Sequence, residues 1–270
     1  MLDYHVHTRY CRHATGEVED YVKAALSLGL DEIGFADHFP MFYLPELPYD
    51  DYSMDFEELP AYVAEVGRVR GMFSDRIGVK VGVEVDYQRG KETTIKRAVS
   101  TQEFDYLIGV IHLVDGWVVD DTRNVDKFRE YELDKLYRKY FDELEALIKS
   151  GIFDIVGHID VIKRFNFIPE GGVEQYVLPC LDLIAEKGLC VELNTSGLDR
   201  PVCDTYPGLN LLEAMRCQGI PITLGSDAHD PAEVGRHFGR VLVELKKSGY
   251  LKVACFEKRS MLTKRLSAFS

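Results

Sequence analysis

Leu2-Asp3-Tyr4-His5-Val6-His7 is a short strand-like stretch near the start of the 270-residue chain, and it ends in polar residues. Six further apolar stretches also end in a polar residue. The seven are Leu2–His7, Glu32–His38, Val79–Asp86, Tyr106–His112, Phe153–Asp160, Leu189–Ser196 and Pro221–His229. Near-continuous Val, Ile, Leu and Gly is typical of strands that are buried on both faces of a parallel sheet.

Segments with helical periodicity lie between these stretches. They are Glu17–Gly29, Arg129–Ser150, Val173–Gly188, Leu209–Gly219 and Val234–Gly249. The alternation of strand and helix predicts βα units with right-handed crossovers, in either a closed barrel or an open sheet. A barrel brings every strand end to one rim, where it can share a site with the others. We therefore expect a seven-stranded, TIM-like (β/α)7 barrel, with residues 1–270 as a single domain.

Two segments fall outside this pattern. Lys252–Phe256 is short and carries charges at both ends, so we do not count it as an eighth barrel strand. Phe39–Tyr52 is rich in proline and tyrosine, and we expect it to be a long loop on the rim that acts as a lid.

The composition excludes several function classes. A formal net charge of −13 argues against a nucleic-acid partner, but it allows a small anionic substrate if bound cations supply positive charge. No apolar run approaches the roughly 20 residues that span a bilayer. Six scattered cysteines without a C-x-x-C spacing predict reduced thiols and a cytoplasmic location. Nothing in the sequence indicates an oligomeric state.

Seven of the eight histidines lie in or just after the predicted strand ends. They are His5, His7, His13, His38, His112, His158 and His229. Residues i and i+2 of a strand point the same way, so His5 and His7 share a face, and so do Asp227 and His229. A lone strand histidine is more often a core residue, but so many at one rim predict a metal site. Glu84 and Asp227 bring the predicted ligands to nine, enough for two or three ions.

The ligand types restrict the metal. Imidazole and carboxylate donors suit zinc, manganese or iron, rather than calcium or a thiolate zinc finger.

The chain resembles the PHP (polymerase and histidinol phosphatase) superfamily, and within it most closely the stand-alone histidinol-phosphatases. The motifs that carry the resemblance are His5-x-His7, Cys11-x-His13, Asp37-His38, Gly82-Val83-Glu84-Val85-Asp86, His112, Gly157-His158-Ile159, Asn194-Thr195-Ser196-Gly197 and Gly225-Ser226-Asp227-Ala228-His229. The resemblance implies a distorted seven-stranded barrel with three divalent ions.

The resemblance also implies how the nine ligands divide. One ion would be held by His5, His7, Glu84 and Asp227, a second by Glu84, His112 and His158, and a third by His13, His38 and His229. Glu84 would bridge two ions.

The implied reaction is the hydrolysis of L-histidinol phosphate, a small phosphomonoester of histidine biosynthesis, to L-histidinol and phosphate. A hydroxide that bridges two ions would attack phosphorus, with Glu84, Asp227 and His229 as the catalytic residues. Asp227, His229 or a metal-bound water would serve the leaving group.

The resemblance places two arginines against the phosphate. Arg164 matches one of them, and the adjacent Lys163 is a further candidate. The second position holds Asp199, with Arg200 one residue later. Acidic residues such as Asp160 or Asp115 would recognise the substrate amine.

Other readings remain open on the sequence. One is a PHP-type enzyme that acts on nucleotides or phosphomonoesters in general, or a 3′-exonuclease. Another is a metal hydrolase of the amidohydrolase type, and a third is a non-catalytic metal-binding protein. Glu84 on the third strand, together with the Asp227-x-His229 pair, favours phosphoester chemistry.

Overall fold

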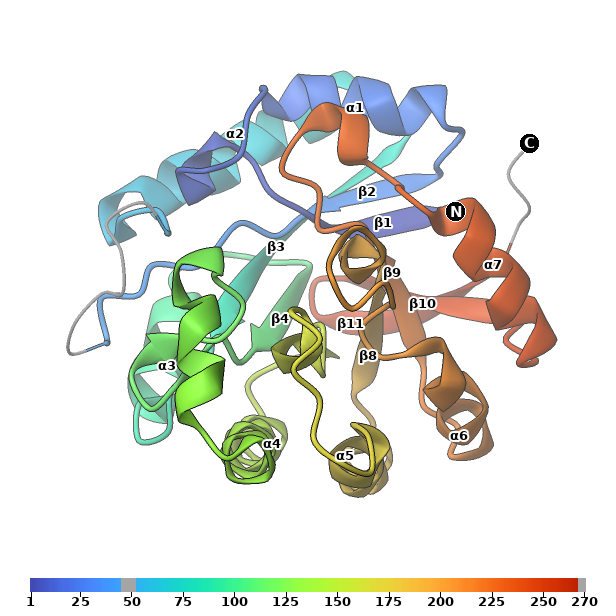
Figure 1. The fold of residues 1–270 in the computed structure, drawn as a ribbon. Coiled ribbons are helices and arrows are strands. Elements are labelled where there is room, and N and C mark those ends of the chain that lie inside the picture. Colours follow the sequence, from blue (N-terminus) through green and yellow to red (C-terminus); the bar gives the residue numbers. More distant parts are fainter. Residues whose placement is uncertain (45–51, 267–270) are drawn as a thin grey trace.

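Seven parallel strands form the centre of the protein, in the sheet order β1-β2-β3-β4-β7-β8-β9. The structure is a computed structural model, and it describes residues 1–44 and 52–266. The strands are β1 (Leu2–Val6), β2 (Glu32–Phe35), β3 (Gly78–Asp86), β4 (Tyr106–Val110), β7 (Ile155–Val156), β8 (Cys190–Asn194) and β9 (Ile222–Gly225). They curve into a nearly closed barrel with the helices outside (Figure 1). The predicted seven-stranded barrel is confirmed, although several strands are shorter than expected.

Helices cover the outer surface of the barrel. They are α1 (Val18–Ser27), α2 (Leu59–Met72), α3 (Glu92–Val99), α4 (Leu133–Lys149), α5 (Glu174–Lys187), α6 (Leu212–Cys217) and α7 (Phe238–Lys247). In α4, Leu136, Tyr140 and Leu144 lie one turn apart and are all buried, as the predicted apolar stripe requires. The five predicted helices are present, whereas α2 and α3 were not identified from the sequence. Helix α3 has only eight residues, and α2 contains valines and glycines that weaken a helical signal.

The barrel closes between β1 and β9 without a regular ladder. The only bridge between them in the described chain pairs Val6 with Ala228, beyond the end of β9. The His7 N–H donates to the Ala228 carbonyl at 2.9 Å. The buried carboxylate of Asp3 accepts the Ser226 N–H at 2.9 Å and also the Ser226 hydroxyl. A side chain therefore replaces part of the missing ladder.

A C-terminal hairpin of β10 (Lys252–Glu257) and β11 (Ser260–Arg265) lies apart from the barrel sheet. The exclusion of Lys252–Phe256 from the barrel is thus confirmed, although the segment is a strand. Its Phe256 ring lies 6.2 Å from Tyr106, at the first residue of β4. The Arg259 N–H donates to the Asp105 carbonyl just before β4. The hairpin thus covers the amino ends of the strands and leaves the carboxyl ends open.

Smaller elements complete the carboxyl-end rim. A hairpin of β5 (Leu113–Val114) and β6 (Trp117–Val118) follows β4, and 3-10 helices span Thr122–Glu130 and Ser196–Asp199. Of the expected lid, residues 45–51 lie outside the described residues. Tyr52 at its end is buried, with its ring centroid 4.6 Å from that of His38. The six cysteines are free, and no described helix is long and apolar enough to cross a membrane.

Candidate metal centre

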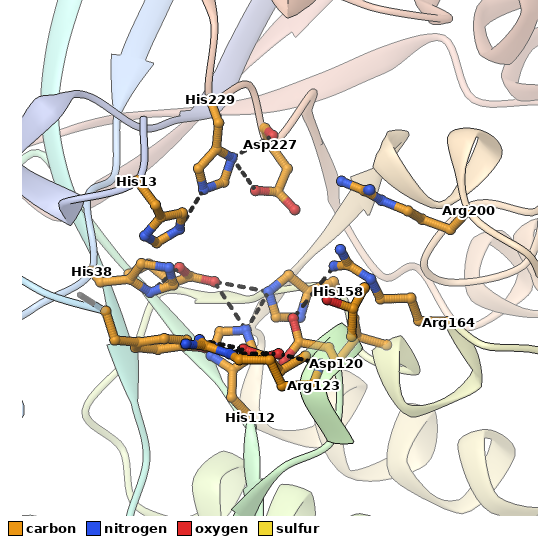
Figure 2. Close-up of a pocket in the computed structure, with 15 residues that line it drawn as sticks. His13, His38, His112, Asp120, Arg123, His158, Arg164, Arg200, Asp227 and His229 are labelled. Carbon is orange, nitrogen blue, oxygen red and sulfur yellow. Dashed lines mark hydrogen bonds and ion pairs between the residues drawn. The ribbon is translucent and has the colours of Figure 1, made fainter. Parts of the chain in front are cut away.

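All nine predicted ligands meet at the carboxyl end of the barrel. They come from or directly follow β1 (His5, His7, with His13 in the next loop), β2 (His38), β3 (Glu84), β4 (His112), β7 (His158) and β9 (Asp227, His229). Seven of them line a cavity of about 410 Å³ (Figure 2). The remaining two, His5 and His7, lie beneath the cavity against Glu84. The strand ends thus bring together residues that are more than 200 positions apart.

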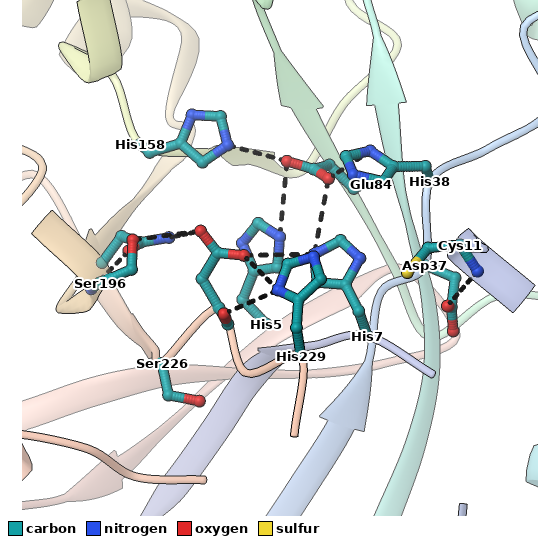
Figure 3. Close-up of polar contacts among 12 residues, drawn as sticks. His5, His7, Cys11, Asp37, His38, Glu84, His158, Ser196, Ser226 and His229 are labelled. Atoms are coloured by element: carbon teal, nitrogen blue, oxygen red, sulfur yellow. Dashed lines mark hydrogen bonds and ion pairs between the residues drawn. The ribbon is translucent and has the colours of Figure 1, made fainter. Parts of the chain in front are cut away.

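Glu84 lies at the centre of the cluster and is buried. Its Oε1 is 2.8 Å from His158 Nε2 and 3.4 Å from His5 Nε2. Its Oε2 is 2.8 Å from His38 Nδ1 and 3.7 Å from His7 Nε2 (Figure 3). His112 Nε2 lies 3.7 Å from Oε1 as well. One carboxylate therefore faces five imidazoles from four different segments, three on Oε1 and two on Oε2. This is the arrangement expected of a carboxylate that bridges two ions.

The spacing of donor atoms fits metal ions. Two ligand atoms on one tetrahedral zinc lie about 3.3 Å apart, given bonds of about 2.0–2.1 Å. His112 Nε2 and His158 Nε2 are 3.2 Å apart, and His13 Nε2 and His229 Nε2 are 3.0 Å apart. His7 Nε2 lies 3.4 Å from Asp227 Oδ1.

Buried carboxylates orient two of the histidines. His5 Nδ1 is 2.6 Å from Glu192 Oε1, and His112 Nδ1 is 2.9 Å from Asp86 Oδ1. These contacts leave the Nε2 lone pair of each ring directed at the cluster. His5 Nε2 is buried and has no hydrogen-bond partner among the described residues. A buried polar atom normally has a hydrogen-bond partner. A bound metal ion would provide the missing partner for this nitrogen.

The sequence reasoning missed Glu192, which contacts two of the predicted ligands. Its Oε2 accepts the His158 N–H at 2.8 Å, while its Oε1 holds His5. It therefore ties the ligand from β1 to the ligand after β7. The available signal was a charged residue inside the strand Cys190–Asn194, between apolar neighbours.

The charges of the cluster compete for protons. Burial by itself lowers the pKa of His5, but the carboxylates of Glu192 and Glu84 outweigh it and raise that pKa well above the usual value. Burial raises the pKa of Glu84, but the surrounding imidazoles, His38 foremost, hold it well below its usual value. Protons thus occupy a site that divalent cations would occupy instead. The donor set, its spacing and its buried partners identify a metal-binding site.

Asp227 and His229 converge for a reason that differs from the predicted one. Strand β9 ends at Gly225, so the alternation of strand side chains does not extend to them. Asp227 instead has a left-handed backbone with φ of 53°. His229 Nδ1 lies 3.1 Å from the Asp227 carbonyl, and Ser196 Oγ lies 3.1 Å from Asp227 Oδ2. Burial lowers the pKa of His229 to about 4, so this ring is neutral and able to bind a cation.

Two arginines line the same cavity. Arg164 and Arg200 lie on the side opposite His13 and His38 (Figure 2). The Nε atom of each is buried without a hydrogen-bond partner in the described part of the chain. Burial, and then the nearby charge of Arg164, lower the pKa of Arg200. Burial and mutual repulsion destabilise these two positive charges. An anion bound between the arginines and the metal ligands would stabilise them.

The neighbour of Arg200 is turned away from the cavity. Asp199 lies 2.7 Å from His237 Nε2 and 3.7 Å from Arg236 Nη1. The loop therefore presents Arg200 rather than Asp199 to the site.

The structure does not bring Lys163 to the described lining of the cavity. Its buried ammonium lies 2.8 Å from Asp160 Oδ2 and 2.9 Å from Asp204 Oδ2, and it is absent from the described lining of the cavity. Asp160 is engaged in that pair, and Asp115 pairs with Lys139 outside the cavity. Both were expected to recognise the substrate amine, but the structure places neither of them in the described lining of the cavity. Their sequence positions lie near strand ends, and their side chains form ion pairs with lysines instead.

Comparison with known proteins identifies the family. Residues 3–196 match the PHP domain. The chain is 38% identical over 261 residues to a protein of Deinococcus radiodurans named "Probable histidinol-phosphatase", covering 97% of this chain and 98% of the relative. It is 27% identical to the histidinol-phosphatase of Lactococcus lactis, covering 94% of each chain.

A solved structure shares the fold. It is that of histidinol phosphate phosphatase from Lactococcus lactis, complexed with zinc, L-histidinol and phosphate. The TM-score is 0.83 at 23% sequence identity, and the match covers 97% of this chain and 98% of that one. The chain thus belongs to the PHP-domain family, and its full-length relatives carry the name histidinol-phosphatase.

Proposed function

We propose that this protein is a metal-dependent phosphomonoesterase that hydrolyses L-histidinol phosphate to L-histidinol and phosphate. The observation that carries the proposal is a single cavity with the proposed metal ligands on one wall and Arg164 and Arg200 on the other, each with a buried Nε that has no hydrogen-bond partner among the described residues. This pairing suits a dianionic phosphoryl group, which needs cations on more than one side. The names of the full-length relatives support the choice of substrate.

The distances support the first of the ligand groups that the family resemblance implies. His5, His7 and Glu84 offer atoms within 4.8 Å of one another, and Asp227 is next to His7. Three ions would use the nine ligands fully, with Glu84 as the bridge. Zinc, manganese and iron suit these donors. When bound, such ions supply the Lewis acidity that lowers the pKa of water and neutralises phosphoryl oxygens.

The side chains of this protein would bind and orient the substrate. Arg164 and Arg200 would donate to the phosphoryl oxygens from the side opposite the ligands. Their paired donors suit oxyanions, and the charge-assisted bonds would replace the hydrogen bonds that both Nε atoms lack. The substrate would thereby be held with phosphorus facing Glu84 and its histidines.

We assign recognition of the substrate amine to Asp120. This residue lines the cavity, unlike Asp160 and Asp115, and its Oδ2 lies 3.5 Å from Arg164 Nη1. The neighbouring Asp121 lines the cavity too, but its carboxylate already caps a 3-10 helix and pairs with Arg123. A loosely held carboxylate beside the phosphate site matches a substrate that carries an anion and a cation close together.

The proposal is tested by phosphate release from L-histidinol phosphate, a nucleoside monophosphate and glycerol phosphate, each with and without chelator. We expect L-histidinol phosphate to have the highest kcat/KM, with activity lost in chelator and restored by zinc or manganese. Turnover that survives complete metal removal would sink the metal-dependent mechanism. Good turnover of the other esters without turnover of L-histidinol phosphate would sink the substrate assignment alone.

A further inference from the structure

The segment Ser226–His229 holds two proposed metal ligands although it belongs to no strand. A left-handed backbone is unfavourable for residues with a Cβ atom, and Asp227 adopts it with φ of 53°. Its carbonyl and that of Ser226 lie where the regular ladder of β9 has ended. A backbone in this state needs outside partners to hold one orientation.

Arg236 supplies these partners. Its Nε donates to the Ser226 carbonyl at 2.8 Å, and its Nη2 donates to the Asp227 carbonyl at 2.7 Å. The planar guanidinium therefore grips two successive carbonyls with two parallel donors. The Thr195 hydroxyl in turn donates to the Arg236 carbonyl at 2.8 Å, so the arginine is anchored to the end of β8.

Glu233 extends the grip to the second ligand. Its Oε1 lies 3.1 Å from Arg236 Nη1, and its Oε2 accepts the His229 N–H at 2.8 Å. Arg236 also lies 3.7 Å from Asp199, the residue before Arg200. One guanidinium thus connects the segment with two ligands to the loop with a proposed phosphate-binding arginine.

We infer that Arg236 is a positioning residue for metal binding, which acts by clamping the left-handed backbone at Asp227. The carboxylate of Asp227 must face His7 at 3.4 Å, and a ligand has to be held within about 0.5 Å of its working position. Rotation of either clamped peptide would swing this carboxylate away. Arg236 is not among the described residues that line the cavity, so its effect reaches the site through Asp227 and His229. The inference rests on the proposed ligand role of Asp227 and not on the identity of the substrate.

The positive charge of Arg236 and its two-pronged hydrogen bonding through Nε and Nη2 have opposite expected effects on zinc affinity. Their contributions can therefore be separated by substitution. A positive charge near the ligands repels cations, so a purely electrostatic role predicts that its removal strengthens zinc binding. The clamp predicts the reverse. Arg236→Lys keeps the charge but loses the planar fork, whereas Arg236→Met loses both. Arg240→Met, on the exposed face of α7, is the matched control.

The experiment is a zinc titration of the metal-free proteins against a competing chelator, together with Tm values with and without zinc. We expect Arg236→Lys and Arg236→Met each to bind zinc about 10–100-fold more weakly than wild type, as for other residues that orient metal ligands. The increase in Tm caused by zinc should shrink in both, while Arg240→Met resembles wild type. Saturating zinc should restore much of kcat and leave KM near the wild-type value.

Two results would overturn the inference. One is wild-type zinc affinity in both Arg236 variants with a lowered Tm of the metal-free protein, which would leave Arg236 a purely structural role. The other is tighter zinc binding by Arg236→Met alone. Arg236→Lys keeps the test decisive if Arg236→Met does not fold. Wild-type zinc affinity in Asp227→Asn would instead refute the proposed ligand role, independently of Arg236.

Discussion

The cavity has two walls whose side chains are held with different firmness. The ligand wall consists of the nine proposed metal ligands, including His5 and His7 beneath the cavity, and the arginine wall consists of Arg164, Arg200 and Asp120. On the ligand wall, buried carboxylates fix the rings of His5 and His112 at 2.6 and 2.9 Å. Asp37 accepts the Thr8 and Cys11 N–H groups at 2.8 and 3.1 Å, which fixes the turn between His7 and His13. On the other wall, Arg164 meets Asp120 only at 3.5 Å.

This difference follows from what each wall has to bind. A metal ion tolerates little error in the position of its ligands, so the ligand wall is built on strand ends and braced from behind. A phosphoryl group supplies hydrogen-bond acceptors of its own. Arginine N–H groups that have no partner beforehand can therefore donate to it when it binds. The ligand wall is therefore preorganised, whereas the arginine wall obtains its hydrogen-bond partners only when the substrate binds.

Replacing the central carboxylate should break the ligand wall most severely. We expect Glu84→Gln to lower kcat/KM by about 1000-fold, or ~4 kcal/mol of transition-state stabilisation, because one carboxylate serves several ligand groups. Metal content, measured by mass spectrometry, should fall in parallel. Glu213→Gln on the exposed surface of α6 is the control. A Glu84→Gln enzyme with full metal content and normal rate would contradict the bridging role.

Removing an arginine should damage the other wall without disturbing the metal. Arg164→Met and Arg200→Met are each expected to reduce kcat/KM by about 100-fold, since a charge-assisted bond to the substrate is lost. Their metal content should remain that of wild type. The exposed Arg97→Met is the control. Loss of metal in either variant would mean that the two walls are not independent.

Weakening a carboxylate that orients a ligand should reduce metal binding less than removing the ligand itself. Glu192→Gln keeps the shape of the side chain but weakens its hold on His5 and on the His158 N–H. We expect zinc affinity to fall by about 10–100-fold, with the fold retained. Chelator competition measures the affinity, and circular dichroism checks the fold. Unchanged affinity would show that the strand ends position the ligands without this carboxylate.

Substitution of Asp120 tests whether the arginine wall also recognises the substrate amine. We expect Asp120→Asn to raise KM for L-histidinol phosphate by about fivefold to tenfold, because one charge-assisted contact is weakened, and to leave KM for glycerol phosphate unchanged. Asp115→Asn, outside the cavity, is the control. An equal increase for both substrates would instead assign Asp120 to the positioning of Arg164.

The smallest effect concerns the ligand wall without its metal. Burial lowers the pKa of His112, but Asp86 and the other nearby carboxylates raise it from 6.5 to about 10. A raised folded pKa gives stability that is full below the unfolded value and is lost as pH rises towards the folded one. The Tm of the chelated protein should therefore fall between pH 6.5 and 10. Zinc affinity should rise over the same range, because the ligands release protons. A chelated protein whose Tm rises with pH would contradict the charge assignment.

The convergence of the nine proposed ligands could be predicted because polar residues stand out against apolar strands. Glu84 and all but one of the histidines among them lie at or near the ends of such stretches in the sequence, and a barrel brings strand ends together. The same logic did not show that Lys163 and Asp160 pair with each other, since an ion pair within one turn after a strand leaves no periodic signature. The role inferred for Arg236 was equally hidden, because it depends on hydrogen bonds to two backbone carbonyls, which a sequence pattern does not show. The left-handed turn at Asp227 could not be anticipated either, because aspartate carries no obligatory signal for it.

The seam between β1 and β9 has a consequence for the order in which the molecule can be completed. Asp3 and Ser226 are 223 positions apart, yet their contact closes the barrel, and the ligands His5 and Asp227 lie on either side of that closure. Chain entropy opposes contacts between such distant positions, and they give no stabilisation until both ends are present. During synthesis the cluster therefore stays incomplete until residues 227–229 have emerged. Metal capture is thus expected only after that point, when the ion links β1 to the segment that follows β9.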